Sequence, residues 1–127
     1  MSTEQQNLET AERLYAAFRA GNVDAFDDLI DEDYVQHNPL VGAGRAAMKE
    51  LFRDFGPLDI VVHRMLADKD MIAAHINCKT WNVAAIDIFR FNKRGKIIEH
   101  WDVIQEVPEK TESGLDMFTQ YSAVKAG

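Results

Sequence analysis

The sequence has little cysteine and no long apolar run, and each shortage excludes a class of protein. The 127 residues include a single cysteine, Cys78, which cannot form an internal disulfide and therefore favours a reducing compartment. No apolar run approaches the length that crosses a membrane, and the N-terminal segment lacks a basic-then-apolar profile. We therefore expect a cytoplasmic protein without a membrane partner, in which Cys78 is a small core residue.

Positive charge is also scarce. The chain has 14 Lys and Arg against 21 Asp and Glu, a net charge of -7, which argues against a nucleic-acid or anionic-membrane partner. Lys93, Arg94 and Lys96 form a basic cluster that is typical of a solvated turn. The chain also lacks a phosphate-binding loop, a Gly-x-Ser-x-Gly elbow and a Cys-x-x-Cys pair.

What is present is the composition of an ordinary globule, with 46% apolar and 28% charged residues. This length predicts one domain, residues 1–127, that buries roughly two-thirds of the surface of its unfolded chain. Apolar residues recur at helical spacing in three early segments. The first segment begins at Ser2 or Thr3 and ends at Gly21, the second begins at Asn22 or Asp24, and the third lies between Gly44 and Gly56.

The period then changes to two, which predicts strands at residues 58–67 and 71–81 and a hairpin over residues 82–107. A short extended segment, residues 34–38, precedes the third helix. Three helices before a mainly antiparallel sheet predict an α+β domain with its helices on one face. A curved sheet would close with these helices into a cone, whose open mouth is a natural small-molecule pocket. We expect the tail, residues 108–127, to pack on the sheet or on a second subunit.

Three polar side chains interrupt the apolar arms of the hairpin: Asp87, His100 and Asp102. If Lys93 and Arg94 form a two-residue loop, Asp87 lies opposite His100. Asp102 then lies one step along the same face, opposite Ala85, and Phe89, Phe91 and Ile98 share that face. A glycine bulge at Gly95 would instead place His100 opposite Ile88. On the preferred register an acid–imidazole–acid cluster is framed by apolar groups.

Three segments of the chain resemble the SnoaL-like polyketide-cyclase family, which belongs to the NTF2-like group of cone-shaped α+β proteins. They are Tyr34-Val35-Gln36-His37-Asn38-Pro39, Ile86-Asp87-Ile88-Phe89-Arg90 and Gly95-Lys96-Ile97-Ile98-Glu99-His100-Trp101-Asp102-Val103. The similarity extends from about residue 5 to residue 107, and the Glu-His-Trp-Asp run is its most specific part. The chain looks most like the branch of predicted SnoaL-like aldol-condensation enzymes.

The resemblance implies ring closure by aldol chemistry without metal or organic cofactor, with a pocket aspartate as acid and base, in a homodimer. Asp102 matches that aspartate, and His100 and Asp87 match cavity-lining positions. One carboxyl group in an apolar pocket can remove a proton next to a carbonyl and later protonate the alkoxide. A histidine beside it could polarise the carbonyl oxygen or hold the base in place. The alternative is a satisfied acid–histidine network that only fixes the sheet register.

Two other functions stay open, because the scaffold also hosts isomerases, epoxide hydrolases and non-catalytic binding proteins. A hydrolase would use the carboxylates to activate water, with an Asp-Arg-Asp set. Arg90 follows Asp87 at an odd offset and should face away, which argues against it. A binding or interaction module would hold a small molecule without chemistry on it.

Further candidates for substrate binding lie outside the hairpin cluster. His37 and Tyr34 belong to the extended segment, where a chain could line the mouth of the cone. His75 would face His63 across a three-residue loop at 68–70, yet nothing supplies a third ligand, so we expect no metal site. Phe52, Phe89 and Trp81 should wall the cavity or fill the core, whereas Glu99 and Trp101 should face the other way.

Overall fold

The longest helix begins and ends where the sequence supplies caps. The computed structural model describes residues 2–121. Helix α1 spans Thr3–Ala20, and the Ser2 hydroxyl accepts a hydrogen bond of 3.1 Å from the Gln5 N–H. Gly21 ends α1 with a φ of 68°, a left-handed conformation that glycine adopts without strain. These caps agree with the boundaries that the sequence predicts.

The second helical segment is shorter than the sequence suggests. A 3-10 turn, η1 (Val23–Ala25), leads into the single α-helical turn α2 (Phe26–Leu29). The chain then becomes extended at Ile30, so the segment expected at residues 34–38 is a longer strand, β1 (Ile30–Gln36). Helix α3 spans Gly44–Phe55 and ends at Gly56, as predicted.

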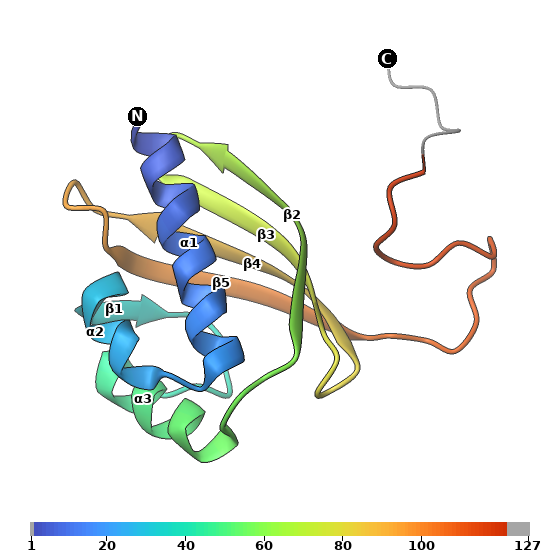
Figure 1. The fold of residues 1–127 in the computed structure, drawn as a ribbon, viewed down its shortest axis with the longest axis horizontal. Coiled ribbons are helices and arrows are strands. Elements are labelled where there is room, and N and C mark those ends of the chain that lie inside the picture. The colour runs from blue at the N-terminus through green and yellow to red at the C-terminus, as the bar shows by residue number, and fades with distance from the viewer. Residues whose placement is uncertain (1, 122–127) are drawn as a thin grey trace.

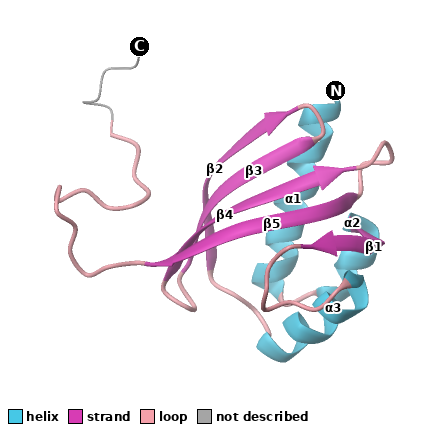
Figure 2. Ribbon diagram, turned by 180° about the vertical axis from the view of Figure 1, so that it is seen from behind, coloured by secondary structure: helices cyan, strands magenta, loops and turns pink. Residues whose placement is uncertain are grey.

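The sheet contains β1 and four longer strands: β2 (Ile60–Asp68), β3 (Met71–Cys78), β4 (Val83–Phe91) and β5 (Ile97–Glu106). Their order is β1-β5-β4-β3-β2; β1 runs parallel to β5, and the other pairs are antiparallel. The helices lie on the same side of this sheet (Figures 1 and 2). The expected α+β architecture with a mainly antiparallel sheet is therefore confirmed.

The core fills the space between the helices and the inner face of the sheet. Strand β3 alternates strictly, with Ile72, Ala74, Ile76 and Cys78 buried and the residues between them less so. Helix α1 crosses this face and packs against β2 and β3, whereas α3 packs against β1 (Figure 1). None of the helices in residues 2–121 is long and apolar enough to span a membrane.

The β4–β5 hairpin has a register that differs from both predicted ones. The Gly95 N–H donates to the Asn92 carbonyl (3.0 Å), the Asn92 N–H donates to the Lys96 carbonyl (2.9 Å), and Gly95 has a φ of 79°. The loop is thus one residue longer than the preferred register assumes. It contains the glycine bulge at Gly95 that the alternative register predicts. A second register shift lies between Arg90 and Phe91.

The two shifts together place Asp87 opposite Asp102 and Phe89 opposite His100. The predicted pairs of Asp87 with His100 and of Asp102 with Ala85 are therefore wrong, as is His100 with Ile88. Each shift of one residue reverses the face of the strand, and two shifts restore it. For that reason the three polar residues still share the inner face.

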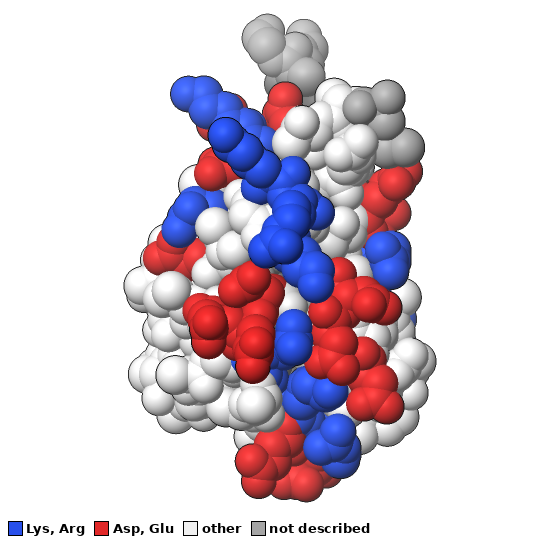
Figure 3. Space-filling model, turned by 90° about the vertical axis from the view of Figure 1, so that its left-hand side faces the viewer, with Lys and Arg blue, Asp and Glu red and all other residues white. Residues whose placement is uncertain are grey.

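Charged side chains gather on the flank of the molecule beside α2 and the β4–β5 hairpin (Figure 3). Asp27 accepts hydrogen bonds of 3.0 and 2.9 Å from Lys49 and pairs with Arg45 at 3.2 Å. The hydrogen bond from Lys49 is the main reason that the pKa of Asp27 lies below its usual value. Lys96 reaches the Asp27 carbonyl at 3.2 Å, so part of the basic cluster is tied to this flank.

The described part of the tail returns to the outer face of β2 and β3. The ring of Phe118 stacks on His63 with centroids 4.6 Å apart and planes 13° apart. The Phe118 carbonyl also accepts a hydrogen bond from Arg64. The end of the predicted tail segment, residues 122–127, lies outside the described residues.

Candidate active site

The inner face of the sheet and the helices enclose a cavity of about 370 Å³. Its walls are mostly apolar, as in typical small-molecule sites. Leu40 (85% exposed), Trp81 (45%) and Ile104 (50%) line it and also reach solvent, so they mark its mouth. Four of the residues predicted from the sequence to bind substrate line this cavity: Tyr34, Phe52, Trp81 and Phe89.

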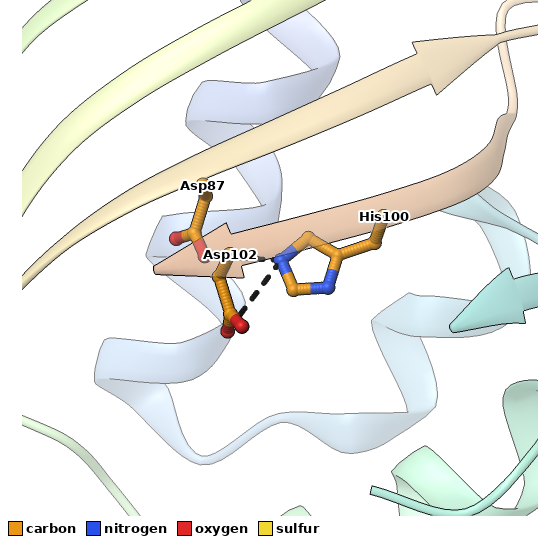
Figure 4. Close-up of side chains that lie close together, drawn as sticks. All are labelled: Asp87, His100 and Asp102. Atoms are coloured by element: carbon orange, nitrogen blue, oxygen red, sulfur yellow. Dashed lines mark hydrogen bonds and ion pairs between the residues drawn. The ribbon is translucent and has the colours of Figure 1, made fainter. Parts of the chain in front are cut away.

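Asp87, His100 and Asp102 also line the cavity and face one another (Figure 4). Asp87 comes from β4 and the other two from β5. The His100 Nε2 lies 3.0 Å from Asp87 Oδ1 and 4.0 Å from Asp102 Oδ2. The side chains of all three are at most 14% exposed. An imidazole and two carboxylates are thus held together in a mostly apolar environment.

Asp87 is almost fully buried and receives two hydrogen-bonding partners. The Tyr15 hydroxyl, from α1, donates to Asp87 Oδ2 at 2.5 Å, and His100 contacts the other oxygen. Burial, and then the nearby Asp87 charge, raises the pKa of Tyr15 well above its ordinary value of 10.0. Tyr15 is therefore a permanent hydrogen-bond donor to Asp87 at neutral pH.

Asp102 has a different set of contacts. The Asn38 Nδ2 lies 3.0 Å from Oδ1 and 2.9 Å from Oδ2, so one amide nitrogen contacts both carboxylate oxygens. The Asn38 Oδ1 in turn accepts from the Leu40 N–H at 2.8 Å, which fixes the amide. Asp102 therefore has fewer hydrogen-bond donors than its charge can accept, and lone pairs remain that can take a proton.

These three side chains are also the described residues that come closest to a metal-binding set. One ligand atom of each lies within 4.8 Å of the others. Nε2 and Oδ1 are at hydrogen-bonding distance, so a cation would have to displace the proton between them. The observed geometry is that of a proton-sharing cluster.

His37 does not line the cavity, contrary to the sequence-based prediction. Its ring stacks on Trp101 with centroids 4.9 Å apart, and its Nε2 lies 2.7 Å from Glu99, on the outer face of the sheet. Gln36 and Asn38 line the cavity instead, because neighbouring positions of an extended chain face opposite ways. As expected, Trp101 and Glu99 face away from the cavity.

His75 likewise lies on the outer face, and its predicted role in the cavity is wrong. It alternates with the buried Ala74 and Ile76, and its ring lies beside Phe118 and Arg64. The β2–β3 turn is shorter than assumed, since Asp68 pairs with Met71, so Arg64 and not His63 lies opposite His75. Burial, followed by the charges of Arg64 and His63, lowers the pKa of His75.

The sequence pattern indicates no role in the site for Tyr15 or Gln36. Tyr15 has the spacing of a core residue of α1, and Gln36 lies between the predicted binding residues Tyr34 and His37. Both act through contacts between distant parts of the chain, which local spacing does not predict. A polar group at a buried helical position, the Tyr15 hydroxyl, is the one clue that the sequence offers.

Comparison with known proteins gives a family and a fold. Residues 11–100 match the SnoaL-like domain family, whereas no curated protein matches the chain. An NTF-2 like protein of unknown function from Burkholderia xenovorans superposes with a TM-score of 0.75 and 19% identity, over 94% of this chain and 98% of that one. A putative ketosteroid isomerase from Kribbella flavida gives 0.75 and 18%, over 100% and 99%.

An LEH-like epoxide hydrolase from M. tuberculosis superposes with a TM-score of 0.67 and 16% identity, over 82% of this chain and 86% of that one. At such identities these proteins share the fold with this chain. The expected NTF2-like architecture is therefore confirmed, and the chemistry must be argued from the cavity itself.

Proposed function

Because the chain belongs to the SnoaL-like domain family, we propose that it binds a small, mostly apolar carbonyl compound and moves protons on it without a cofactor. Aldol condensation, ring closure and isomerisation are the reactions of this class. The observation that carries the proposal is the position of Asp102: a carboxylate that reaches the cavity, held by one amide group, beside an imidazole.

In the proposed reaction Asp102 is the base. It removes a proton from the carbon next to a carbonyl group, and the resulting enolate attacks a second carbonyl carbon. The new C–C bond leaves an alkoxide, which takes up a proton, so that one proton has moved from carbon to oxygen. For an isomerisation, the proton returns to another carbon of the same substrate. The apolar walls favour this chemistry, because they exclude water that would compete for the enolate.

His100 and Asp87 support this base. Their contact holds the imidazole beside Asp102, where it can stabilise negative charge that develops on the carbonyl oxygen. Tyr15 anchors Asp87 from the side of α1. The cluster thus combines a proton acceptor with a polarising group at one wall of the cavity.

An epoxide hydrolase of the Asp-Arg-Asp type is less well supported. Arg90 pairs with Glu99, its Nη2 at 2.7 Å, on the outer face. Among the described residues, those that line the cavity include neither Lys nor Arg. The positive group that such a set requires is therefore missing from the cavity wall, and this also disfavours substrates that carry a carboxylate or phosphate.

We also propose that the protein is a cytoplasmic homodimer that pairs through the outer face of the sheet. Apolar side chains reach solvent there: Leu66 (69% exposed), Ile86 (40%) and Val103 (76%). Exposed apolar groups that share one face are typical of interaction surfaces.

The test is turnover of a panel of apolar aldehydes, ketones and dicarbonyl compounds, followed by chiral chromatography of the products. Asp102→Asn should lower kcat by about 100-fold or more, the usual contribution of a general base. Asp54→Asn, at an exposed position of α3, is the matched control and should retain full activity.

Equal turnover by Asp102→Asn and the native protein would refute the role of Asp102. Release of a diol from an epoxide panel would favour the hydrolase. Tight binding of a carbonyl compound that is recovered unchanged would favour a binding module.

A further inference from the structure

Gln36 holds His100 from the side opposite the two carboxylates. The Oε1 of Gln36 lies 2.7 Å from His100 Nδ1, while His100 Nε2 faces Asp87 Oδ1 at 3.0 Å. Each ring nitrogen of His100 therefore faces an oxygen atom. Which of the two carries a proton depends on the orientation of the Gln36 amide.

That orientation is fixed by a third residue. The backbone N–H of Asn38 points at the same Gln36 atom, at 3.0 Å. A backbone N–H can only donate, so the atom that it meets must be the amide oxygen. The Gln36 Nε2 then donates to the Tyr34 hydroxyl at 3.0 Å, in agreement with this assignment. An amide oxygen can only accept, and Nδ1 of His100 must therefore carry a proton.

The proton on Nδ1 has a consequence for the other ring nitrogen. A neutral imidazole has one N–H, and in His100 this N–H donates to Gln36. The contact between Nε2 and Asp87 needs a second proton, either on the ring or on the carboxyl group. The Tyr15 hydroxyl does not supply it, because it donates to the other oxygen of Asp87. The His100–Asp87 pair consequently holds one transferable proton beside Asp102.

We propose that Gln36 is a positioning residue that keeps His100 in the Nδ1–H form and thereby makes the His100–Asp87 pair the acid of the reaction, with Asp102 as the base. This inference rests on the proposed function and assigns its two proton transfers to two different groups. Asp102 takes the proton from carbon, and Nε2 gives its proton to the oxygen of the new alkoxide. The proton on Asp102 then returns to the His100–Asp87 pair across the 4.0 Å gap, which restores the starting state.

The groups that face His100 come from four elements. Asp87 and Phe89 lie on β4, Asp102 on β5, Gln36 on β1 and Tyr15, through Asp87, on α1. Among the described residues, Gln36 is the one that hydrogen-bonds His100 Nδ1. A change at this position therefore alters the partner of Nδ1, and it also removes the acceptor of the Asn38 N–H.

The experiment is nitrogen-15 NMR of the histidine rings in the native protein at neutral pH, with His100→Asn used to assign the resonances of His100. The native ring should carry a proton on Nδ1. In Gln36→Leu, Nδ1 has no acceptor, so the neutral ring should switch to the Nε2–H form and donate to Asp87. Gln36→Glu keeps an acceptor oxygen and should retain the Nδ1 proton. Gln105→Leu, the same change at an exposed site of β5, should leave the spectrum unaltered.

A native ring without a proton on Nδ1 would overturn the proposal, and so would a folded Gln36→Leu variant that keeps the Nδ1 proton. If Gln36→Leu does not fold, the native and Gln36→Glu spectra decide the question. Once a substrate is known, kcat should be about 10-fold or more lower in Gln36→Leu than in the native protein, with little change in KM. In Gln36→Glu, kcat should return towards the native value.

The spectra need no substrate, so the two proposals can fail separately. Loss of activity in Asp102→Asn together with an unaltered tautomer in Gln36→Leu would refute the role of Gln36 alone. The expected tautomers without turnover of any carbonyl compound would refute the proposed function alone.

Discussion

One hydroxyl group from α1 helps to explain how a carboxylate is tolerated in the core. Asp87 is 8% exposed and lies among apolar neighbours, where an unpaired charge would be costly. The Tyr15 hydroxyl and the His100 ring contact its two oxygens, one each. Hydrogen bonds to an ionised group are among the stronger ones in proteins. Tyr15 therefore stabilises the buried Asp87 in addition to lining the cavity.

We expect Tyr15→Phe to lower the free energy of unfolding by about 1.5–3 kcal/mol at neutral pH, because Asp87 loses a hydrogen bond to a charged group. The raised pKa of Tyr15 adds a pH dependence. The phenol stabilises the fold fully below the unfolded pKa of about 10, and this contribution is lost as the pH rises towards the folded pKa. Urea unfolding at neutral and alkaline pH tests both parts.

The Tyr15→Phe variant itself should lack the alkaline loss that is due to the phenol. Tyr121→Phe, at an exposed site, is the control and should match the native protein. A Tyr15→Phe variant with unchanged stability at neutral pH would show that the hydrogen bond to Asp87 contributes little.

Asn7 is the opposite case, a buried polar group without partners. It lies on α1 with 1% of its surface exposed, and neither of its amide atoms has a hydrogen-bond partner among the described residues. Asn7→Leu should raise the free energy of unfolding by about 1–3 kcal/mol, since the unmet amide is replaced by an apolar group of similar size. Thermal unfolding measures the change, with the exposed neighbour Gln6→Leu as the control. A lower melting temperature in Asn7→Leu would contradict the reasoning.

At the scale of the elements, alternation explains both what the sequence predicts well and what it misses. The helix ends at Gly21 and Gly56 follow from local cap chemistry, and the shared face of His100 and Asp102 follows from strand periodicity, whereas Asp87 joins them because two register shifts cancel. The register of the β4–β5 hairpin cannot be predicted from the sequence, because the second shift, beyond the turn, has no local sequence signal. Contacts such as Tyr15 to Asp87, 72 residues apart, depend on how α1 lies across the sheet.

The extended residues that follow β1 offer a direct test of alternation. Asn38→Ala should lower kcat by about 10- to 100-fold, because Asp102 loses the amide that orients it. His37→Ala, one residue away, should leave kcat unchanged, because His37 faces Trp101 and Glu99 on the outer side. The two variants change neighbouring residues and differ in the face that they change. Equal losses in both would mean that the effect comes from the loop and not from Asp102.

For the whole molecule, the two faces of the sheet differ in the side chains that they carry. The inner face carries the cavity, and the outer face exposes Leu66, Ile86 and Val103. Ile86 and Val103 lie opposite each other on β4 and β5, so their side chains form a continuous apolar strip. In the proposed dimer, this strip is the contact surface for the second copy of the chain.

Val103→Asp should therefore convert the proposed dimer to a monomer, because each subunit would bury a charge at the interface. Light scattering coupled to size-exclusion chromatography measures the mass. Leu115→Asp, at an exposed site of the tail, is the control and should leave the mass unchanged. A native protein that elutes as a monomer at all concentrations would refute pairing through this face.

The two register shifts of the β4–β5 hairpin also limit how this chain can change in length during evolution. A single insertion or deletion in β5 between Ile97 and Glu99 would turn His100 and Asp102 to the outer face and leave Asp87 alone in the cavity, whereas a residue added to the loop of Lys93, Arg94 and Gly95 leaves the strand pairing intact. A second compensating change would bring them back. Among homologues that keep this cluster, differences in length between Asp87 and His100 should therefore gather in the loop of Lys93, Arg94 and Gly95, and a single-residue change in the strand segments beside it should mark proteins that have lost the site.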